Sequence, residues 1–128
     1  MDHLSIVKWE APSTLRLEIG VTRPGQPPEE GPRSYQAHLI TPETAHTCHY
    51  FWKWGRDFKL EDPEFSTRLQ ASLQTAFETE DGPMIEAQSV HMGGQPQEAL
   101  KPVLLPTDSA SLRARRVLQQ LIVQQVVS

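Results

Sequence analysis

The sequence contains a single cysteine, no long apolar run and no excess of basic residues. Cys48 has no second cysteine to pair with, which excludes an internal disulfide and a metal site built from several cysteines. No stretch approaches the roughly 18 apolar residues of a membrane-spanning helix, and residues 1–10 lack a secretory leader pattern. The formal net charge is −4. We therefore expect a cytoplasmic protein with neither a membrane nor a nucleic-acid partner.

The length and composition of the chain suit one domain. The chain has 128 residues, of which 38% are hydrophobic and 22% are charged. Such a composition is typical of globular proteins and allows one hydrophobic core. We therefore expect residues 1–128 to form a single domain.

The first half of the chain carries strand signals. From Thr14 to Thr22, apolar residues alternate with polar or small ones, the period of two that marks a half-buried strand. Three more strands are expected at residues 5–10, 34–40 and 47–53, with a loop at the proline-rich residues 23–33.

The second half carries helix signals. Asp62 and Pro63 suit the start of a helix, and an apolar stripe with a spacing of four follows at Phe65, Leu69, Leu73 and Phe77. Gly82–Pro83 interrupts this pattern, so the helix either resumes there or continues with a kink. A last helix is expected to start near residues 107–109. The predicted fold class is α+β, an antiparallel sheet plus two long helices.

Asp81 takes the next position of the apolar stripe, so two interpretations are open. If the helix stays regular, this carboxylate points into a core or cavity and needs a metal ion, a cation or several hydrogen-bond donors. If Gly82–Pro83 ends the helix, Asp81 is an exposed residue at its C-terminus.

Three histidines lie in or near the last two predicted strands. His38 shares a strand face with Gln36 and Ile40 and is either a satisfied structural histidine or a ligand-binding one. His46 and His49 make a poor chelating pair, because a spacing of three in a strand places side chains on opposite faces. We predict that Cys48, which has no reactive-thiol signature, is a small buried side chain.

Three ordered motifs carry a family resemblance. They are HLITPETAHTCHYFW at residues 38–52, AFETEDGPMIEAQ at residues 76–88 and KPVLLPTDSASLRARRVLQQLI at residues 101–122. Together they resemble the C-terminal part of the catalytic domain of Rieske non-haem iron oxygenase large subunits, in particular the vanillate O-demethylase branch.

The resemblance implies a partial helix-grip fold and a role in oxygenase chemistry. Relatives use Fe(II) and dioxygen to hydroxylate or O-demethylate aromatic acids, with the iron held by two histidines and a carboxylate. Asp81 matches the carboxylate ligand. His38 and, secondarily, His49 are the candidate residues for binding the substrate, an aromatic carboxylic acid.

Two departures from the family pattern shape the functional expectation. No pair of ligand histidines precedes the sheet, and one cysteine is too few for a 2Fe–2S Rieske cluster. We therefore expect the chain to be part of an oxygenase, inactive alone and dependent on a reductase or a companion chain. The alternative is a standalone helix-grip module that binds a small aromatic or hydrophobic ligand. Exposed apolar surface also leads us to expect a homo-oligomer.

Overall fold

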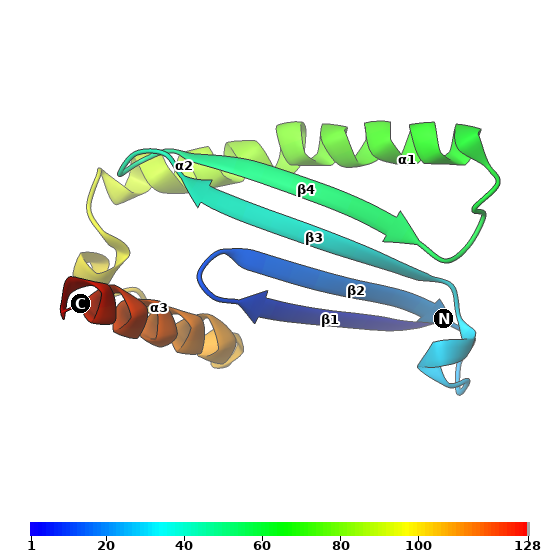
Figure 1. Ribbon diagram of the computed structural model, residues 1–128, viewed down its shortest axis with the longest axis horizontal. Helices are drawn as coiled ribbons and strands as arrows, with labels where there is room; N and C mark the ends of the chain where they lie inside the picture. The colour runs from blue at the N-terminus through cyan, green and yellow to red at the C-terminus, as the bar shows by residue number, and fades with distance from the viewer. Residues whose placement is uncertain (128) are drawn as a thin grey trace. The chain divides into compact units, whose positions relative to one another are not determined.

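The computed structural model describes residues 1–127, and the chain divides into two units. One unit joins residues 1–58 to the stretch that starts at Leu105, and the other covers Lys59–Leu104. The elements comprise a four-stranded antiparallel sheet and two long helical stretches (Figure 1). The predicted α+β fold class is therefore confirmed.

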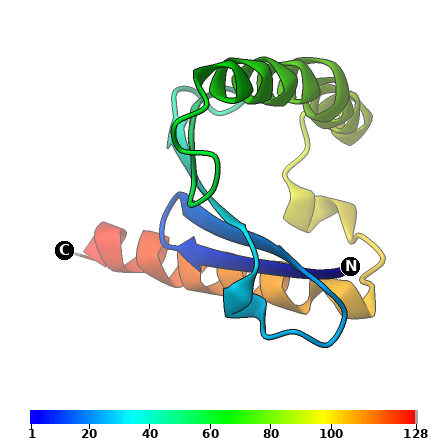
Figure 2. The ribbon, with the colours of Figure 1, turned by 90° about the vertical axis from the view of Figure 1, so that its right-hand side faces the viewer.

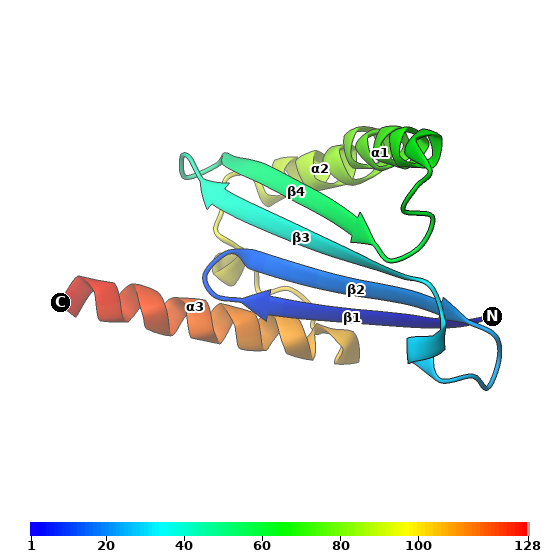
Figure 3. The same cartoon turned by 45° about the vertical axis from the view of Figure 1, so that its right-hand side comes forward.

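The first unit is built on a sheet with the strand order β1-β2-β3-β4. The strands span Asp2–Glu10 (β1), Thr14–Thr22 (β2), Arg33–Pro42 (β3) and Cys48–Arg56 (β4). Each strand pairs antiparallel with the next one along the chain (Figure 3). A short 3-10 helix, η1 (Pro28–Glu30), lies in the loop between β2 and β3.

The register of the sheet sorts its side chains onto two faces, because directly opposed residues of an antiparallel pair point to the same side. The aromatic face carries two adjacent cross-strand rows, Trp9–Leu15–His38–Trp52 and Val7–Leu17–Gln36–Trp54. The charged face carries the rows Lys8–Arg16–Ala37–Lys53 and Ile6–Glu18–Tyr35–Gly55.

The last helix, α3 (Ser109–Val127), belongs to the same unit as the sheet. It follows a 3-10 turn, η4 (Pro106–Asp108), in which the Asp108 carboxylate accepts the Leu105 N–H at 2.8 Å. Apolar residues of α3 line a hollow together with Ala11 and Pro12 of the β1–β2 turn, and α3 runs alongside this hairpin (Figure 2).

The second unit is one helical stretch made of three parts. They are α1 (Pro63–Ala76), a π-helical turn η2 (Phe77–Asp81) and α2 (Gly82–Met92). The predicted start is confirmed, because the Asp62 carboxylate accepts the Phe65 N–H at 2.8 Å as an N-cap. The helix ends at Gly93, which has a φ of 58° in the left-handed region that favours glycine. A 3-10 turn, η3 (Gln97–Leu100), follows.

Gly82 and Pro83 explain the π-helical turn. Proline has no N–H, and in a regular α-helix its ring would clash with the carbonyl group of Thr79, four residues earlier. The chain adopts a wider turn instead, in which the Gly82 N–H donates to the Phe77 oxygen, five residues earlier. A Cβ atom on Gly82 would lie 3.0 Å from that oxygen, so a glycine suits this tight approach. The helix therefore continues through Gly82–Pro83 instead of ending there.

Apolar packing within the described residues is incomplete. Among those of residues 1–125 whose exposure is described, no hydrophobic side chain is buried. Large apolar groups such as Val7 and Phe51 are 59% and 58% exposed. Contiguous exposed apolar surface marks sites of association.

We expect the isolated chain to self-associate at micromolar concentration, because uncovered apolar side chains and the sheet edges β1 and β4 favour pairing with a second copy. Size-exclusion chromatography with light scattering should give a mass above the 14.5 kDa of one chain. A monodisperse monomer that unfolds cooperatively on heating would contradict this expectation.

Candidate functional site

His38 lies at the centre of the aromatic face and is its most enclosed residue. The side chain is 7% exposed, and its cross-strand neighbours are Leu15 on β2 and Trp52 on β4. Its ring stacks on that of Tyr50, with 5.8 Å between ring centroids and 20° between ring planes. The sheet therefore holds one imidazole among aromatic groups.

Both ring nitrogens of His38 are hydrogen-bonded. Nε2 lies 3.1 Å from the Gln36 side-chain oxygen, and Nδ1 contacts the Tyr50 hydroxyl. An amide oxygen only accepts hydrogen bonds, so Nε2 carries the proton and donates it to Gln36. In the neutral ring Nδ1 then accepts from the Tyr50 O–H. The two partners thereby fix one tautomer.

Burial shifts the protonation equilibrium of His38 toward this neutral form. Desolvation lowers the pKa of the imidazole below its ordinary value, because water no longer stabilises the charged ring. At pH 7 the face therefore presents a neutral N–H donor at Nε2.

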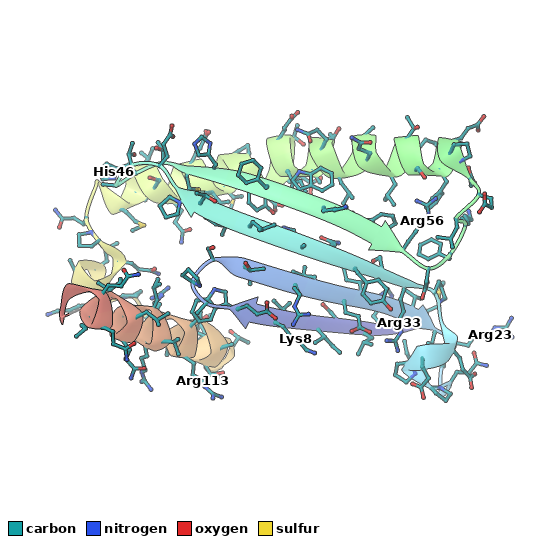
Figure 4. The ribbon with its side chains drawn as sticks, viewed as in Figure 1. Lys8, Arg23, Arg33, His46, Arg56 and Arg113 are labelled. Carbon is teal, nitrogen blue, oxygen red and sulfur yellow. The ribbon has the colours of Figure 1, made fainter. Side chains whose placement is uncertain are left out.

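The same face continues toward Arg56 at the end of β4 (Figure 4). The Arg56 guanidinium lies 5.7 Å from the centroid of the Trp54 ring, and its Nε donates to the Phe58 carbonyl oxygen at 2.7 Å. Trp54 also meets the Phe58 ring edge-on at a centroid distance of 6.4 Å. Aromatic rings beside a few fixed donors are the usual lining of a site for a small aromatic anion.

The other two histidines of this region lie away from His38. His49 is paired with Thr41 on the opposite face of the sheet, where it is exposed and its Nε2 lies 3.7 Å from a Glu43 oxygen. His46 lies in the β3–β4 loop (Figure 4). The structure therefore does not bring His38 and His49 together, and a substrate role for His49 stays a prediction.

The exposure of Cys48 contradicts one expectation. This residue was predicted to be buried, but it is exposed, because it is the first residue of the edge strand β4 opposite Pro42.

Asp81 lies in the π-helical turn of the second unit. Its side chain is exposed, whereas Phe65, Leu69, Leu73 and Phe77 of the stripe are half-buried. A π-helical turn inside an α-helix is frequently found at functional sites. The role of Asp81 as a metal ligand stays a prediction.

A complete set of three metal ligands is not found among the described residues. Within residues 1–127, no group of three histidine, cysteine, aspartate or glutamate side chains converges on one point. A site of two histidines and a carboxylate needs three such ligands. Asp81 would supply one of them.

Sequence reasoning missed the hydrogen-bond partners of His38. The spacing of two places Gln36 on the face of His38, whereas no local pattern singles out Tyr50. The signal for Tyr50 is its cross-strand pairing with Ile40, which follows from the β3–β4 register rather than from either strand alone.

Comparison with known protein families gives one match that spans most of the chain. The family described as "Vanillate O-demethylase oxygenase C-terminal domain" matches residues 1–124. The oxygenase component of chloroacetanilide N-alkylformylase from Rhizorhabdus wittichii is 39% identical over 119 residues, covering 93% of this chain and 34% of that protein. The oxygenase component of dicamba O-demethylase from Stenotrophomonas maltophilia is 30% identical, covering 94% of this chain and 36% of that protein.

Solved structures agree with these relatives. Dicamba monooxygenase bound to 3,6-dichlorosalicylic acid superposes with a TM-score of 0.86 at 28% identity, over 97% of this chain and 36% of that one. The same protein bound to dicamba gives the same score. The chain thus spans about a third of the length of the relatives that it matches.

The length and apolar character of the helices bear on membrane insertion. Among residues 1–127, no helix is both long and apolar enough to span a bilayer.

We expect the His38 imidazole to titrate below about pH 6.5, the ordinary value for histidine. The unfolded chain then binds a proton more readily than the folded one, so the stability contributed by His38 is complete above this pH. It is lost progressively as the pH falls toward the lowered pKa. Nitrogen-15 NMR of the imidazole should show an Nε2 proton at pH 7, and a charged ring at that pH would refute the assignment.

Replacing Tyr50 by phenylalanine should cost about 1 kcal/mol of unfolding free energy, because Nδ1 of His38 loses its donor. Tyr35→Phe is the matched control, since Tyr35 lies on the charged face and is 45% exposed. Chemical denaturation of both variants measures the difference. Equal stability losses would show that the Tyr50 hydroxyl does not support His38.

Proposed function

This chain belongs to the vanillate O-demethylase oxygenase C-terminal domain family, and we propose that it forms part of a Rieske-type oxygenase that acts on a small aromatic acid. In this proposal it contributes the substrate-facing side of a sheet and the carboxylate ligand of the iron, as the distal part of a catalytic domain. The observation that carries the proposal is the family match over residues 1–124, joined to a buried, hydrogen-bonded His38 on an aromatic sheet face.

His38 would receive the carboxylate of the substrate. The neutral ring offers its Nε2 proton, which the Gln36 amide oxygen accepts in the structure described. A carboxylate forms a stronger hydrogen bond than a neutral amide, so it would replace Gln36 at this proton. The Tyr50 hydroxyl would keep the ring oriented from the other side.

The aromatic ring of the substrate would lie against the tryptophans of this face. Trp52 is the cross-strand neighbour of His38, and Trp54 follows it on β4. Stacked or edge-on contacts with their rings would exclude water and orient the substrate. Support comes from dicamba monooxygenase, whose solved structures hold dicamba and 3,6-dichlorosalicylic acid.

Asp81 would provide the carboxylate of an iron site that is completed by residues outside those described. Fe(II) bound by two histidines and one carboxylate keeps open positions at which dioxygen reacts. The described residues include no converging group of three ligands, so the proposal needs a companion segment or chain for the histidines. It also needs a reductase and a Rieske cluster for electrons.

A second candidate function is binding of an aromatic acid without redox chemistry. The fixed His38 donor favours it independently of any metal ion, since the hydrogen bonds to Gln36 and Tyr50 involve none. Ligand binding that needs no iron, combined with no turnover in any reconstitution, would select this function.

We expect benzoate to raise the melting temperature of the chain more than its neutral analogue benzamide does, because only benzoate carries the charged acceptor that His38 prefers. His38→Ala should abolish the difference. His46→Ala, an exposed loop residue, should leave it unchanged. Equal responses to benzoate and benzamide in the unaltered chain would overturn the proposed role of His38.

We expect the chain alone to retain no stoichiometric Fe(II), because one carboxylate and water hold the ion weakly. In a mixture with a polypeptide that supplies the Rieske cluster and two histidines, Asp81→Asn should lower iron content and oxygen consumption at least tenfold. The neighbouring Glu80→Gln should not. Tight iron with turnover in the isolated chain, or a loss confined to Glu80→Gln, would refute this assignment.

A further inference from the structure

The charged face of the sheet carries a row of basic residues that the proposed oxygenase chemistry does not use. Lys8, Arg16, Ala37 and Lys53 lie directly opposite one another across the four strands, in that order. We call Lys8, Arg16 and Lys53 the cationic row. The His38 row is displaced from it by one residue on every strand, so the two rows point to opposite sides of the sheet.

Ala37 leaves a hollow in this row. A groove of about 430 Å³ lies over it, lined by Lys8, Arg16, Lys53, Ile6 and Tyr35 among others. The small alanine side chain between larger ones forms the floor of the groove. Tyr35, which is 45% exposed, adds a hydroxyl group to the lining. The groove therefore combines basic groups with an apolar surface.

Two positive charges of the groove are not compensated. Arg16 forms an ion pair with Glu10, and Glu18, which also lines the groove, forms one with Arg33. Lys8 and Lys53 are exposed, and among the described residues neither side chain forms an ion pair or a hydrogen bond (Figure 4 labels Lys8).

The row also contains an unfavourable pair. Lys8 and Arg16 are directly opposed across β1 and β2, and like charges at such positions destabilise a sheet. Glu10 relieves this only in part, because it pairs with Arg16 and not with Lys8. A negative charge placed in the groove would relieve the remaining repulsion.

The spacing of the charges indicates the kind of anion. Neighbouring strands are about 4.8 Å apart, so the backbones at Lys8 and Lys53 are separated by three such steps, or about 14 Å. Two anionic groups several ångströms apart match this span better than a single small ion, which would draw two long side chains together at an entropic cost. The apolar floor between them suits an apolar side chain.

We propose that the cationic row binds an acidic protein segment in which an apolar residue lies between carboxylates. A nucleic acid is disfavoured, because a phosphate backbone is held by many basic contacts and this chain has a net charge of −4 with two uncompensated lysines in the groove. An amphipathic acidic segment satisfies both the lysines and the floor. Charge complementarity of this kind steers association and fixes register.

The test uses a fluorescein-labelled peptide, Glu-Glu-Leu-Glu-Glu, with Gln-Gln-Leu-Gln-Gln as its neutral counterpart, in fluorescence anisotropy titrations of the full chain. The acidic peptide should bind, and more weakly at 200 mM salt than at about 20 mM because the contacts are exposed. Lys8→Gln combined with Lys53→Gln should weaken binding about tenfold, as expected for two exposed charge pairs.

The control removes the same charge elsewhere. Arg113→Gln combined with Arg116→Gln alters two exposed residues of α3 and should leave peptide affinity unchanged. Circular dichroism of both double variants checks that the fold is retained. Equal loss in the two variants, or no loss in the lysine variant, would overturn the proposal.

Two further arms test other anions. Inorganic phosphate that displaces the peptide at equal molar concentration would make the groove a small-anion site and overturn the proposal. A single-stranded oligonucleotide that binds more tightly than the peptide, and loses affinity in the lysine variant, would make it a nucleic-acid surface. Weak displacement in both arms is the expected result.

Discussion

The cross-strand register of the sheet is the constraint on which both sites depend. Because side chains alternate between two faces, the pairing of His38 with Leu15 and Trp52 places the imidazole among aromatic groups. The same pairing sends the neighbouring Ala37 to the opposite side, between Arg16 and Lys53. A slip of one residue would exchange the two faces and destroy both arrangements.

Burial and hydrogen bonding determine the protonation state of His38 and which ring nitrogen carries its proton. His38 is neutral because it is enclosed, and its proton lies on Nε2 because Gln36 only accepts. On the other face, the side chains of Lys8 and Lys53 are exposed and accessible. One sheet thus offers a neutral donor suited to a buried aromatic acid and a basic surface suited to an exposed acidic partner.

Local patterns in the sequence predicted most of the elements. The period of two from Thr14 to Thr22 gave β2, and Asp62–Pro63 gave the start of α1, because both signals act within a few residues. The π-helical turn was harder to foresee, since it reflects how the helix accommodates Pro83, which has no N–H to donate. The exposure of Cys48 depends on its place in an edge strand, which a sequence pattern does not fix.

The candidate site residues follow from the sequence, whereas one of the contacts between them does not. Spacing and family resemblance single out His38 and Asp81, and the spacing of two places Gln36 beside His38, whereas the contact of Tyr50 with His38 needs the register of β3 with β4. The most direct test of the account is nitrogen-15 NMR of the histidine rings at pH 7 during titration with benzoate. The account predicts a neutral His38 whose Nε2 signal shifts while that of His46 does not. A His38 signal that stays unchanged at saturating benzoate would contradict it.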